Sequence, residues 1–451
     1  MHRRFLRGIS ATITLQDLER TSSLSEHRDS LRDRAVLIAT RDQLTAALAL
    51  IELDGIASRL VLCPPGHSNA ELQSIATAAH TDACIVDDDA LGSAMACPKM
   101  GSLIQCTPTL RPINSREPHE CLTEWVLLTS GTTGMPKLVS HTLASLAGEL
   151  QVPYSTGAGL TWSTFYDIRR YGGLQILLRA LLGEGSLLLS DAQESVADFM
   201  TRASAAGVTH FTGTPSHWRR ILMSGSAQLI HPSYVRLSGE TADQSILDHL
   251  RASYPTARIV HAFASTEAGL AFEVSDERAG FPASMLAHGA PGLEIRIEQG
   301  SMLIRSPRTA SHYLNQAQAL RREDGFVDTH DLVELRDGRY YFAGRREGII
   351  NVGGQKCHPE EIESVINRHP MVHMSLVKAR RNPVLGSIVV ADVVLKAHAD
   401  PIAGDSSHEH LRGEILETCR RALDAHKVPA TIRIVTTLDL TPSGKLQRSN
   451  A

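Results

Sequence analysis

Short apolar runs alternate with helix-like segments over the first part of the chain. The runs cover residues 35–39, 60–63 and 83–86, and each has the length of a buried strand. Between the first two, Thr40 is expected to cap a helix, with Gln43 completing a capping box three residues later. Strands that alternate with helices in this way form parallel sheets whose faces the helices cover. The pattern therefore predicts an α/β fold.

The rest of the chain falls into regions that differ in their pattern of apolar and polar residues. The alternation continues with expected helices and strands near 143–150, 173–182, 187–189, 208–212, 234–238 and 259–260. Residues 292–342 change to short alternating segments with glycine turns, which predicts an antiparallel, β-rich subdomain. A separate unit follows, with a helix expected to start at Pro359, and its length suits a small α+β domain. Residues 89–120 are interpreted as a connection and residues 1–15 as a tail.

Length and composition limit the possible classes. A chain of 451 residues is too long for one core, and we expect an N-terminal domain of residues 1–345 and a C-terminal domain of residues 346–451. The net charge of −4 gives no electrostatic basis for nucleic acid or an acidic membrane as a partner. The seven cysteines are scattered without a Cys-x-x-Cys pair, which indicates reduced thiols in a cytoplasmic protein.

A loop rich in glycine and hydroxyl groups follows an apolar run at residues 125–128. It reads TSGTTGMPK from Thr129 to Lys137. Glycines let the backbone approach a ligand, while N–H groups, hydroxyls and a lysine attract anions. The loop therefore predicts a polyphosphate site, although a surface turn would have a similar composition.

Three further stretches carry side chains suited to nucleotide chemistry. Phe263 and Glu267 in FASTE follow an expected strand, where an aromatic ring can stack on a base and a carboxylate can hold Mg²⁺. Asp331 can accept hydrogen bonds from ribose hydroxyls, and Arg345 can pair with ribose or phosphate oxygens. Lys445, in TPSGK, stands on a loop that can reach across a domain gap. Each has a structural alternative. FASTE could be an ordinary capped loop and Asp331 a turn residue. Arg345 could be a solvated charge, and Lys445 could belong to a basic tail.

The order of five motifs resembles the adenylate-forming (ANL) superfamily, which includes acyl- and aryl-CoA ligases, peptide-synthetase adenylation domains and luciferases. The motifs are TSGTTGMPK, FASTE, THD, GRREGIINVGGQKCHPEEIE and TPSGK. The similarity covers about residues 35 to 448. It implies that the C-terminal domain is mobile and that ATP and Mg²⁺ are used.

The resemblance also implies roles for the residues that match its motifs. They are Thr129, Ser130, Gly131, Thr132, Thr133, Gly134 and Lys137 around the ATP phosphates; Phe263 and Gly239 beside the adenine; Thr266 and Glu267 holding phosphate and Mg²⁺; Asp331 and Arg345 on the ribose; and Lys445 on the carboxylate and α-phosphate. Family members attack ATP with a carboxylate, release pyrophosphate and form an acyl-AMP, which a thiol then attacks after the small domain rotates. Glu347 would be the hinge, and Gly353 and Gly354 would line the thiol tunnel.

The chain departs from the family pattern at several points. His330 replaces the usual glycine before Asp331, and Asn351 stands where a lysine is common. Glu347 replaces the usual aspartate or lysine of the hinge. Family members usually carry a further helical and strand region before the first strand that is expected here.

The acid pocket of the family is built partly by the segment after the phosphate loop. Here Tyr166-Asp167-Ile168 is similar to the FDxS motif of amino-acid adenylation domains, whose aspartate holds the substrate ammonium. Asp167 could equally cap a helix or pair with Arg169 or Arg170, and both alternatives stay open. The residues expected to line the pocket are Tyr166, Asp167, Tyr171, Gly172, Gly213 and Ala264.

Three functions are consistent with these residues. The first is an ATP-dependent ligase that transfers a small carboxylic acid to CoA or to the phosphopantetheine of a separate carrier protein. The second is an amino-acid adenylation enzyme that loads a carrier protein. The third is a catalytically silent nucleotide-binding protein, against which the presence of Lys137, Glu267, Asp331, Arg345 and Lys445 argues.

Overall fold

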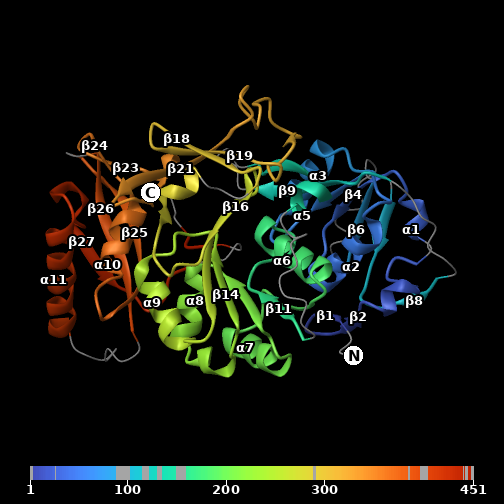
Figure 1. Cartoon of the computed structure of the whole chain (residues 1–451), viewed down its shortest axis with the longest axis horizontal. Coiled ribbons are helices and arrows are strands. Elements are labelled where there is room, and N and C mark those ends of the chain that lie inside the picture. The colour runs from blue at the N-terminus through green and yellow to red at the C-terminus, as the bar shows by residue number, and fades with distance from the viewer. Residues whose placement is uncertain are drawn as a thin grey trace.

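The computed structural model describes most of the chain. The described residues are 4–25, 27–87, 102–113, 121–129, 135–148, 159–287, 291–383, 386–396, 405–439, 441 and 445–447. Two sheets with their helices lie side by side in the N-terminal part, an antiparallel sheet lies above them in the view of Figure 1, and the C-terminal unit lies at the left. The predicted α/β class is confirmed.

The N-terminal sheet contains the apolar runs that the sequence predicted as strands. Its order is β20 (His312–Tyr313), β10 (Lys137–Thr142), β9 (Glu124–Thr129), β5 (Arg59–Leu62), β4 (Ala35–Ile38), β6 (Ala83–Val86) and β7 (Ser102–Gln105). The pairs from β9 to β7 are parallel, and β10 and β20 add antiparallel pairs at one edge. The helices of this region are α1 (His27–Ser30), α2 (Gln43–Leu53), α3 (Asn69–Ala78) and α5 (Leu143–Ala147).

Two local expectations in this region are wrong. The stretch 89–120 is not only a connection, because β7 joins the sheet and β8 (Arg111–Pro112) pairs with β3 (Thr21–Ser22). Helix α2 is capped by Asp42 rather than by Thr40, since the Asp42 carboxylate accepts hydrogen bonds from two backbone N–H groups of the first turn. The Asp42 carboxylate, two residues after Thr40, is the group that reaches these N–H groups.

The large sheet forms the centre of the molecule. Its order is β16 (Gly269–Val274), β15 (Arg258–Ser265), β14 (Tyr234–Ser238), β13 (His210–Gly213), β11 (Thr161–Thr164), β12 (Ser186–Leu189), β1 (Phe5–Arg7) and β2 (Thr12–Thr14). The pairs from β15 to β1 are parallel, and β16 and β2 are antiparallel edges. Parallel strands collect their carboxyl ends at one edge, where ligands bind in such sheets.

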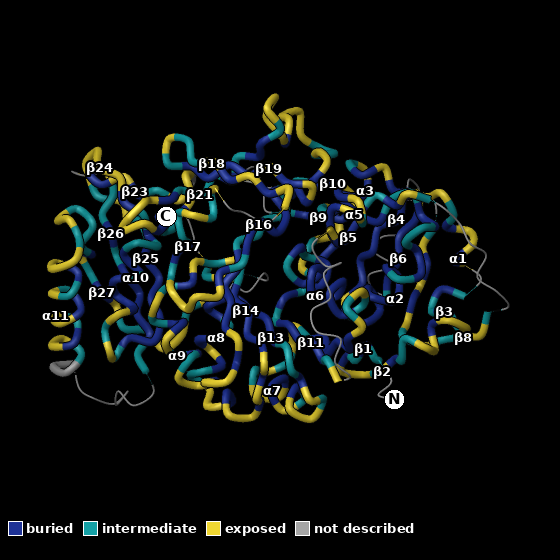
Figure 2. Tube along the Cα trace, in the orientation of Figure 1, coloured by how far each residue is buried: buried dark blue, intermediate teal, exposed yellow. Residues whose placement is uncertain are grey.

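This sheet separates two hydrophobic cores. On one face, Trp162, Tyr234 and Val260 share a core with residues of α6 (Tyr171–Leu182) and α2. On the other face, Phe211 and Val235 pack with α7 (Val196–Ala205), α8 (Pro215–Met223) and α9 (Gln244–Ser253). The central strands are buried, whereas α7 and the C-terminal helix α11 (Asp405–Ala422) have exposed outer sides (Figure 2).

The N-terminal segment is part of this sheet, so its interpretation as a tail is wrong. Leu6 pairs in parallel with Leu187 of β12 and is fully buried. A strand of three residues is too short to show a recognisable alternation of polar and apolar residues. Its partner β12 lies far along the chain, so no local pattern indicates the pairing either.

The antiparallel sheet confirms the β-rich subdomain. Its order is β17 (Phe281–Pro282), β22 (Arg339–Arg345), β21 (Val327–Arg336), β19 (Ser301–Arg305) and β18 (Glu294–Glu298). The register shifts between Ser301 and Leu303 where β19 faces β21, so β21 contains an irregularity at residues 329–331.

The C-terminal unit has a hydrophobic core of its own, built from residues 350–434. Its elements are β23 (Ile350–Val352), β24 (Gln355–Cys357), α10 (Pro359–Ile366), β25 (Val372–Asn382), β26 (Gly386–Leu395), α11 and β27 (Thr431–Ile434). It docks on α8 and α9 through Arg219, which pairs with Asp243 at 2.6 Å and donates to the carbonyl of His373 at 2.9 Å. None of the described helices is both long and apolar enough to cross a membrane.

Candidate active site

The C-terminal segment brings Lys445 to the carboxyl end of β14. The backbone N–H of Leu446 donates to Glu240 Oε1 at 2.9 Å, and this carboxylate also accepts from Ser216 N at 2.9 Å. Gly239 lies directly beneath the lysine, since a Cβ atom on it would lie 3.4 Å from Lys445 Cε. A residue more than 200 positions away in the sequence is therefore placed at the edge where a parallel sheet binds ligands.

Charged groups surround the Lys445 ammonium, although the residue keeps an exposed surface. Burial lowers the pKa of Lys445 below its ordinary value, and Arg345 and Arg170 act in the same direction. Glu240 and Asp331 oppose this shift and raise the pKa. Lys445 thus lies at the meeting point of the large sheet, the antiparallel sheet and the C-terminal segment.

Asp331 and Arg345 lie opposite each other on β21 and β22. Arg345 Nε is 3.5 Å from Asp331 Oδ1, and Arg345 Nη2 donates to the carbonyl of Thr329 at 3.3 Å. The Asp331 side chain is 19% exposed, so it faces the site from a largely enclosed position. Burial raises the pKa of Asp331 to about 6, although Arg345 and Lys445 partly offset the shift.

This shift predicts a pH-dependent affinity for ribonucleotides. The carboxylate offers acceptors for both ribose hydroxyls, whereas its protonated form offers fewer, so the Kd for ATP should rise about tenfold from pH 7 to pH 5. Isothermal titration measures this directly. Asp331→Asn is the control, because ionisation of ATP itself affects both proteins equally. Equal pH slopes in the two proteins would contradict the prediction.

The same shift has a consequence for the ligand-free protein. The pKa of Asp331 is about 6 in the native state, whereas the ordinary pKa of an aspartate, which applies to the unfolded chain, is 3.8. The contribution of this group to stability is therefore present below pH 3.8 and is lost as the pH rises through 6.

His330, which precedes Asp331 where the family pattern has a glycine, adopts a backbone conformation that favours glycine. Its φ of 59° places it in the left-handed region, which costs a residue with a side chain about 1 kcal/mol. The backbone N–H of His330 donates to Asp328 Oδ1 at 2.9 Å, and Thr329 Oγ1 donates to the carbonyl of Met302 at 2.8 Å. These bonds hold the irregular turn that aims Asp331 at the site.

We expect His330→Gly to be more stable than His330→Ala by about 1 kcal/mol in the free energy of unfolding. Both variants remove the imidazole, so their difference isolates the backbone conformation. Urea denaturation at neutral pH measures it. An alanine variant as stable as the glycine variant would show that the left-handed φ carries no cost.

The two ends of the phosphate loop face each other across an antiparallel pair. Thr129 closes β9 and Lys137 opens β10, and the two are direct partners in the ladder. Residues Ser130, Gly131, Thr132, Thr133 and Gly134 lie outside the described part of the chain. The predicted loop is therefore the connection of a β-hairpin whose ends are fixed.

Glu267 lies beside the start of this loop. Thr129 Oγ1 donates to Glu267 Oε1 at 3.4 Å, and the Lys137 ammonium is 5.4 Å from the centroid of the Tyr313 ring. Burial raises the pKa of the Tyr313 hydroxyl, and the neighbouring Glu267 carboxylate raises it further. The carbonyl of Thr266 contacts the Nε2 atom of buried His141 at 2.7 Å, which fixes the turn that carries Glu267.

The Glu267 carboxylate suits Mg²⁺ only together with the oxygens of a bound nucleotide. Among the residues that the structure describes, no group of three or more His, Cys, Asp or Glu side chains could hold a metal ion. Mg²⁺ usually binds through one or two carboxylates plus substrate phosphates and water. A single carboxylate, Glu267, beside the phosphate loop fits that arrangement.

Phe263, predicted to lie beside the adenine, stands near the end of β15. Its ring stacks on Phe342 with a centroid distance of 5.3 Å and an interplanar angle of 10°, and on Phe272 at 5.8 Å. The strand register shifts between Phe263 and Ala264, and Phe263 is half-buried near the end of β15. A flat, partly exposed aromatic face in this position suits the adenine.

The residues expected to line the acid pocket lie near the carboxyl ends of β13, β14 and β15 and at the start of α6. The Tyr166 hydroxyl donates to the carbonyl of Ser238 at 2.8 Å. A Cβ atom on Gly172 would lie 3.5 Å from the Tyr166 ring, and one on Gly213 would lie 3.2 Å from His217 Cβ. Tyr171 is buried against His141, and Ala264 follows Phe263 at the strand end. Gly172 and Gly213 are therefore packed closely, Gly172 against Tyr166 and Gly213 against His217.

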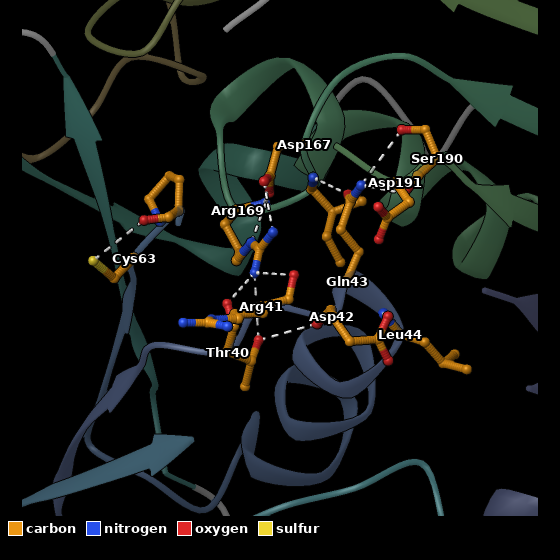
Figure 3. Close-up of polar contacts among 12 residues, drawn as sticks. Thr40, Arg41, Asp42, Gln43, Leu44, Cys63, Asp167, Arg169, Ser190 and Asp191 are labelled. Carbon is orange, nitrogen blue, oxygen red and sulfur yellow. Dashed lines mark hydrogen bonds and ion pairs between the residues drawn. The ribbon is translucent and has the colours of Figure 1, made fainter. Parts of the chain in front are cut away.

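Asp167 adopts the second of its two alternatives, an ion pair. Arg169 donates from Nε and Nη2 to the two oxygens of Asp167 at 2.8 and 2.6 Å, and its Nη1 donates to the carbonyl of Thr40 (Figure 3). The backbone N–H of Ile168 donates to Gln43 Oε1 at 2.8 Å. Gln43, which was expected in a capping box, thus ties the Asp167 loop to the N-terminal sheet.

The residues predicted as hinge and thiol tunnel follow Arg345 in the chain. Glu347 is in a short 3₁₀ helix, Arg346–Gly348, between the antiparallel sheet and the C-terminal unit, and its side chain is outside the described part. Gly353 and Gly354 form the exposed turn between β23 and β24, with φ values of 58° and 87°. Their roles remain predictions for a second arrangement of the domains.

The sequence did not single out the seat of Lys445. Glu240 holds the C-terminal segment and is itself held by the backbone N–H of Ser216, in the first turn of α8. Neither residue belongs to a motif with a distinctive spacing. The signal that could have found Glu240 is its place at the carboxyl end of a predicted parallel strand.

Comparison with known proteins identifies the family. The model of the AMP-binding enzyme family matches residues 35–314, more than half of the chain, and that of the AMP-binding enzyme C-terminal domain matches residues 361–445. The chain therefore belongs to the AMP-binding, adenylate-forming enzymes, as its motifs predicted.

Its similarity to individual CoA ligases is partial in length. The 2-succinylbenzoate–CoA ligase of Salmonella typhimurium is 30% identical over 289 residues, which cover 61% of this chain and 59% of that enzyme. The 4-hydroxybutyrate–CoA ligase 1 of Metallosphaera sedula is 24% identical over 375 residues, which cover 74% of this chain and 63% of that enzyme. The matches thus span about three fifths of the length of these relatives.

Solved structures of adenylating enzymes share the fold. The anthranilate CoA ligase AuaEII in complex with anthranoyl-AMP superimposes with a TM-score of 0.79 at 17% identity, covering 99% of this chain and 92% of that one. ATP-bound MatB from Rhodopseudomonas palustris gives the same TM-score of 0.79 at 18% identity, covering 99% and 94%.

Proposed function

We propose that this chain is an ATP-dependent acid–CoA ligase, which forms an acyl-AMP with release of pyrophosphate and then a thioester. One observation carries the proposal: Lys445 of the C-terminal segment lies near Asp331 and Arg345, which are partners on β21 and β22, at the edge of the large sheet. A silent nucleotide-binding protein would have no need of an ammonium group at that point. The named relatives, which are CoA ligases, support CoA as the acceptor.

The chemistry requires two anions to meet. A carboxylate oxygen of the acid attacks the α-phosphorus of ATP, the bond to the β-phosphate oxygen breaks, and pyrophosphate leaves. Lys445 lowers the repulsion between the two reactants and holds the carboxylate, while Asp331 and Arg345 fix the ribose. Mg²⁺ on Glu267, with Thr266 beside it, would neutralise charge on the phosphates. Residues 130–134 and Lys137 would wrap those phosphates.

The second half-reaction needs the C-terminal unit to move. The thiol of CoA attacks the carbonyl carbon of the acyl-AMP, and AMP leaves with the oxygen that joined the two. In the described arrangement the Gly353–Gly354 turn is exposed and away from Lys445, so rotation about Glu347 would exchange one for the other. We place the domain boundary between residues 345 and 346 for this reason.

The acid is proposed to be small and to lack an amino group at Asp167. Both oxygens of that carboxylate already accept from Arg169, so an ammonium group would have to compete with a bidentate partner. The amino-acid adenylation alternative, with a carrier phosphopantetheine as acceptor, is therefore the less favoured candidate. A cytoplasmic location is proposed from the thiols, since the six described cysteines are free.

The test is acid-dependent release of pyrophosphate from ATP and Mg²⁺, with hydroxylamine present to trap the adenylate. The panel contains aryl acids, short acyl acids, dicarboxylic acids and amino acids. We expect release with acids that lack an amino group, and thioester formation when CoA replaces hydroxylamine. ATP binding without release across the panel would favour the silent protein instead.

A further inference from the structure

The residues on either side of the Lys445 loop are bonded to one another. The backbone N–H of Thr441 donates to the carbonyl of Lys445 at 2.7 Å, and the backbone N–H of Lys445 donates to Thr441 Oγ1 at 3.2 Å. Just outside this pair, the backbone N–H of Gln447 donates to the carbonyl of Asp439 at 3.0 Å. Because these residues are linked in pairs, the two ends of the loop should move together.

The Glu240 carboxylate joins this loop to the large sheet. Leu446, the residue after the lysine, donates from its backbone N–H to Glu240 Oε1 at 2.9 Å. Glu240 follows Gly239, which comes directly after β14, and a Cβ atom on Gly239 would lie 3.4 Å from Lys445 Cε. Two successive residues at the end of one strand therefore contact both the backbone of the loop and the side chain of its lysine.

Glu240 is itself held by the start of α8. Its Oε2 accepts from the backbone N–H of Ser216 at 2.9 Å, and its Oε1 accepts from the Ser216 hydroxyl at 3.0 Å. Ser216 lies in the first turn of α8, where backbone N–H groups have no partner within the helix and the dipole favours an anion. Capping of the helix accounts for these two bonds. It does not account for the bond from Leu446, a residue 206 positions further along the chain.

The charge of Glu240 acts on the same lysine. Burial lowers the pKa of Lys445, and Glu240 is the largest of the effects that oppose this shift. The ammonium has to stay protonated if it is to offset the repulsion between a carboxylate and a triphosphate. One side chain thus anchors the loop and favours the charged form of the lysine that the loop carries.

We propose that Glu240 is a positioning residue for acyl-AMP formation, which holds the Lys445 loop at the carboxyl end of β14 and takes no part in the attack of the thiol. The inference rests on the proposed function, because that function gives Lys445 its role at the reacting carboxylate. Rotation of the C-terminal unit would carry Leu446 away from Glu240, so the bond between them belongs to the first half-reaction. Misplacement of a reacting group by about 1 Å can cost about a hundredfold in rate.

The first test measures the two half-reactions separately in Glu240→Ala. The acid is the member of the panel that releases pyrophosphate fastest, and its chemically prepared acyl-AMP is used with CoA for the second half-reaction. We expect the single-turnover rate of acyl-AMP formation to fall about 10- to 100-fold. Thioester formation from the acyl-AMP and the Kd for ATP should change less than about threefold, since neither depends on the loop being held.

Two further variants accompany this comparison. Glu240→Gln keeps one oxygen acceptor but cannot serve both Leu446 and Ser216 with it, so its rate of acyl-AMP formation should fall between those of the wild type and the alanine variant. Ser195→Ala is the matched control for loss of a helix cap, because the exposed Ser195 side chain caps α7 and accepts from Asp198 N at 3.1 Å. The control should keep both half-reactions at the wild-type rate.

The second test asks whether Glu240 acts through Lys445. Glu240→Ala is combined with Lys445→Ala, and acyl-AMP formation is measured in both single variants and in the double variant. If the glutamate acts by placing the lysine, its replacement should lower the rate less than about twofold once the lysine is absent. Losses that multiply would give Glu240 a role independent of the lysine and would overturn the inference.

Hydrogen exchange at Leu446 tests the contact without any acid. Mass spectrometry of the full-length protein with ATP and Mg²⁺ follows C-terminal peptides that contain Leu446. The Leu446 amide should exchange at least about tenfold faster in Glu240→Ala than in the wild type, and Ser195→Ala should match the wild type. Equal exchange in Glu240→Ala and the wild type would show that the carboxylate does not hold the loop.

The outcomes separate the inference from the proposed function. A wild-type rate of acyl-AMP formation in Glu240→Ala, or equal losses in both half-reactions, would overturn the role of Glu240 while acid ligation stands. Absence of pyrophosphate release by the wild type with every acid, with ATP still bound, would overturn the proposed function and the inference together. Glu240→Gln decides the question if the alanine variant does not fold.

Discussion

Replacing Lys445 with alanine should reduce acyl-AMP formation by about 10²- to 10³-fold and change the affinity for ATP only a few-fold. The ammonium lies above Gly239 and among Asp331, Arg345 and Glu240, where the attacking carboxylate and the α-phosphate must meet. In the proposed reaction its charge would act mainly on the transition state, because the predicted phosphate loop and the predicted ribose residues would still bind ATP.

The measurement is pyrophosphate release under single-turnover conditions, with ATP affinity measured separately. Lys356→Ala is the matched control, because Lys356 is an exposed lysine of the same C-terminal unit on β24. The control should keep its full rate of adenylation. A Lys445→Ala enzyme with an unchanged rate would remove the lysine from the reaction.

Replacing Gly173 with alanine should destabilise the protein by about 3 kcal/mol in the free energy of unfolding and impair adenylation. A Cβ atom on Gly173 would lie 2.2 Å from the carbonyl oxygen of Asp167 and 2.7 Å from the backbone nitrogen of Ile168. These are backbone atoms, so relief requires α6 or the Asp167 loop to move. Either movement would displace Tyr166 from Ser238.

Gly413→Ala provides the control for this variant. Gly413 lies on the exposed side of α11, and a Cβ atom there would meet no atom within 4 Å. Alanine should stabilise that helix by about 0.5–1 kcal/mol, since glycine is the poorer helix former. Urea denaturation of both variants gives the comparison, and a Gly173→Ala protein as stable as Gly413→Ala would contradict the close approach.

Local sequence patterns predicted much of the fold because the strands are short, apolar and flanked by polar residues or proline. The runs at 35–39, 60–63 and 83–86 became β4, β5 and β6, and the α/β class followed from their order. Strand β1 could not be predicted, since Leu6 is held by a partner some 180 residues away. The cap of α2 was misplaced because two candidate caps, Thr40 and Asp42, stand two residues apart.

In the candidate site, too, some features could be predicted from the sequence and others depend on contacts in three dimensions. Asp331 and Arg345 were selected from their chemistry, and they proved to be direct partners across an antiparallel pair. The Asp167 motif left two alternatives, and only the three-dimensional contact with Arg169 distinguishes them.

The central claim is that a carboxylate oxygen of the acid becomes an oxygen of AMP. The most direct measurement uses an acid labelled with ¹⁸O in its carboxylate, together with ATP, Mg²⁺ and CoA, and mass spectrometry of the products. Attack on the α-phosphorus followed by thiolysis predicts one ¹⁸O atom in AMP and none in pyrophosphate. Label in inorganic phosphate with ADP as the nucleotide product, or AMP without label, would contradict acyl-AMP formation by this chain.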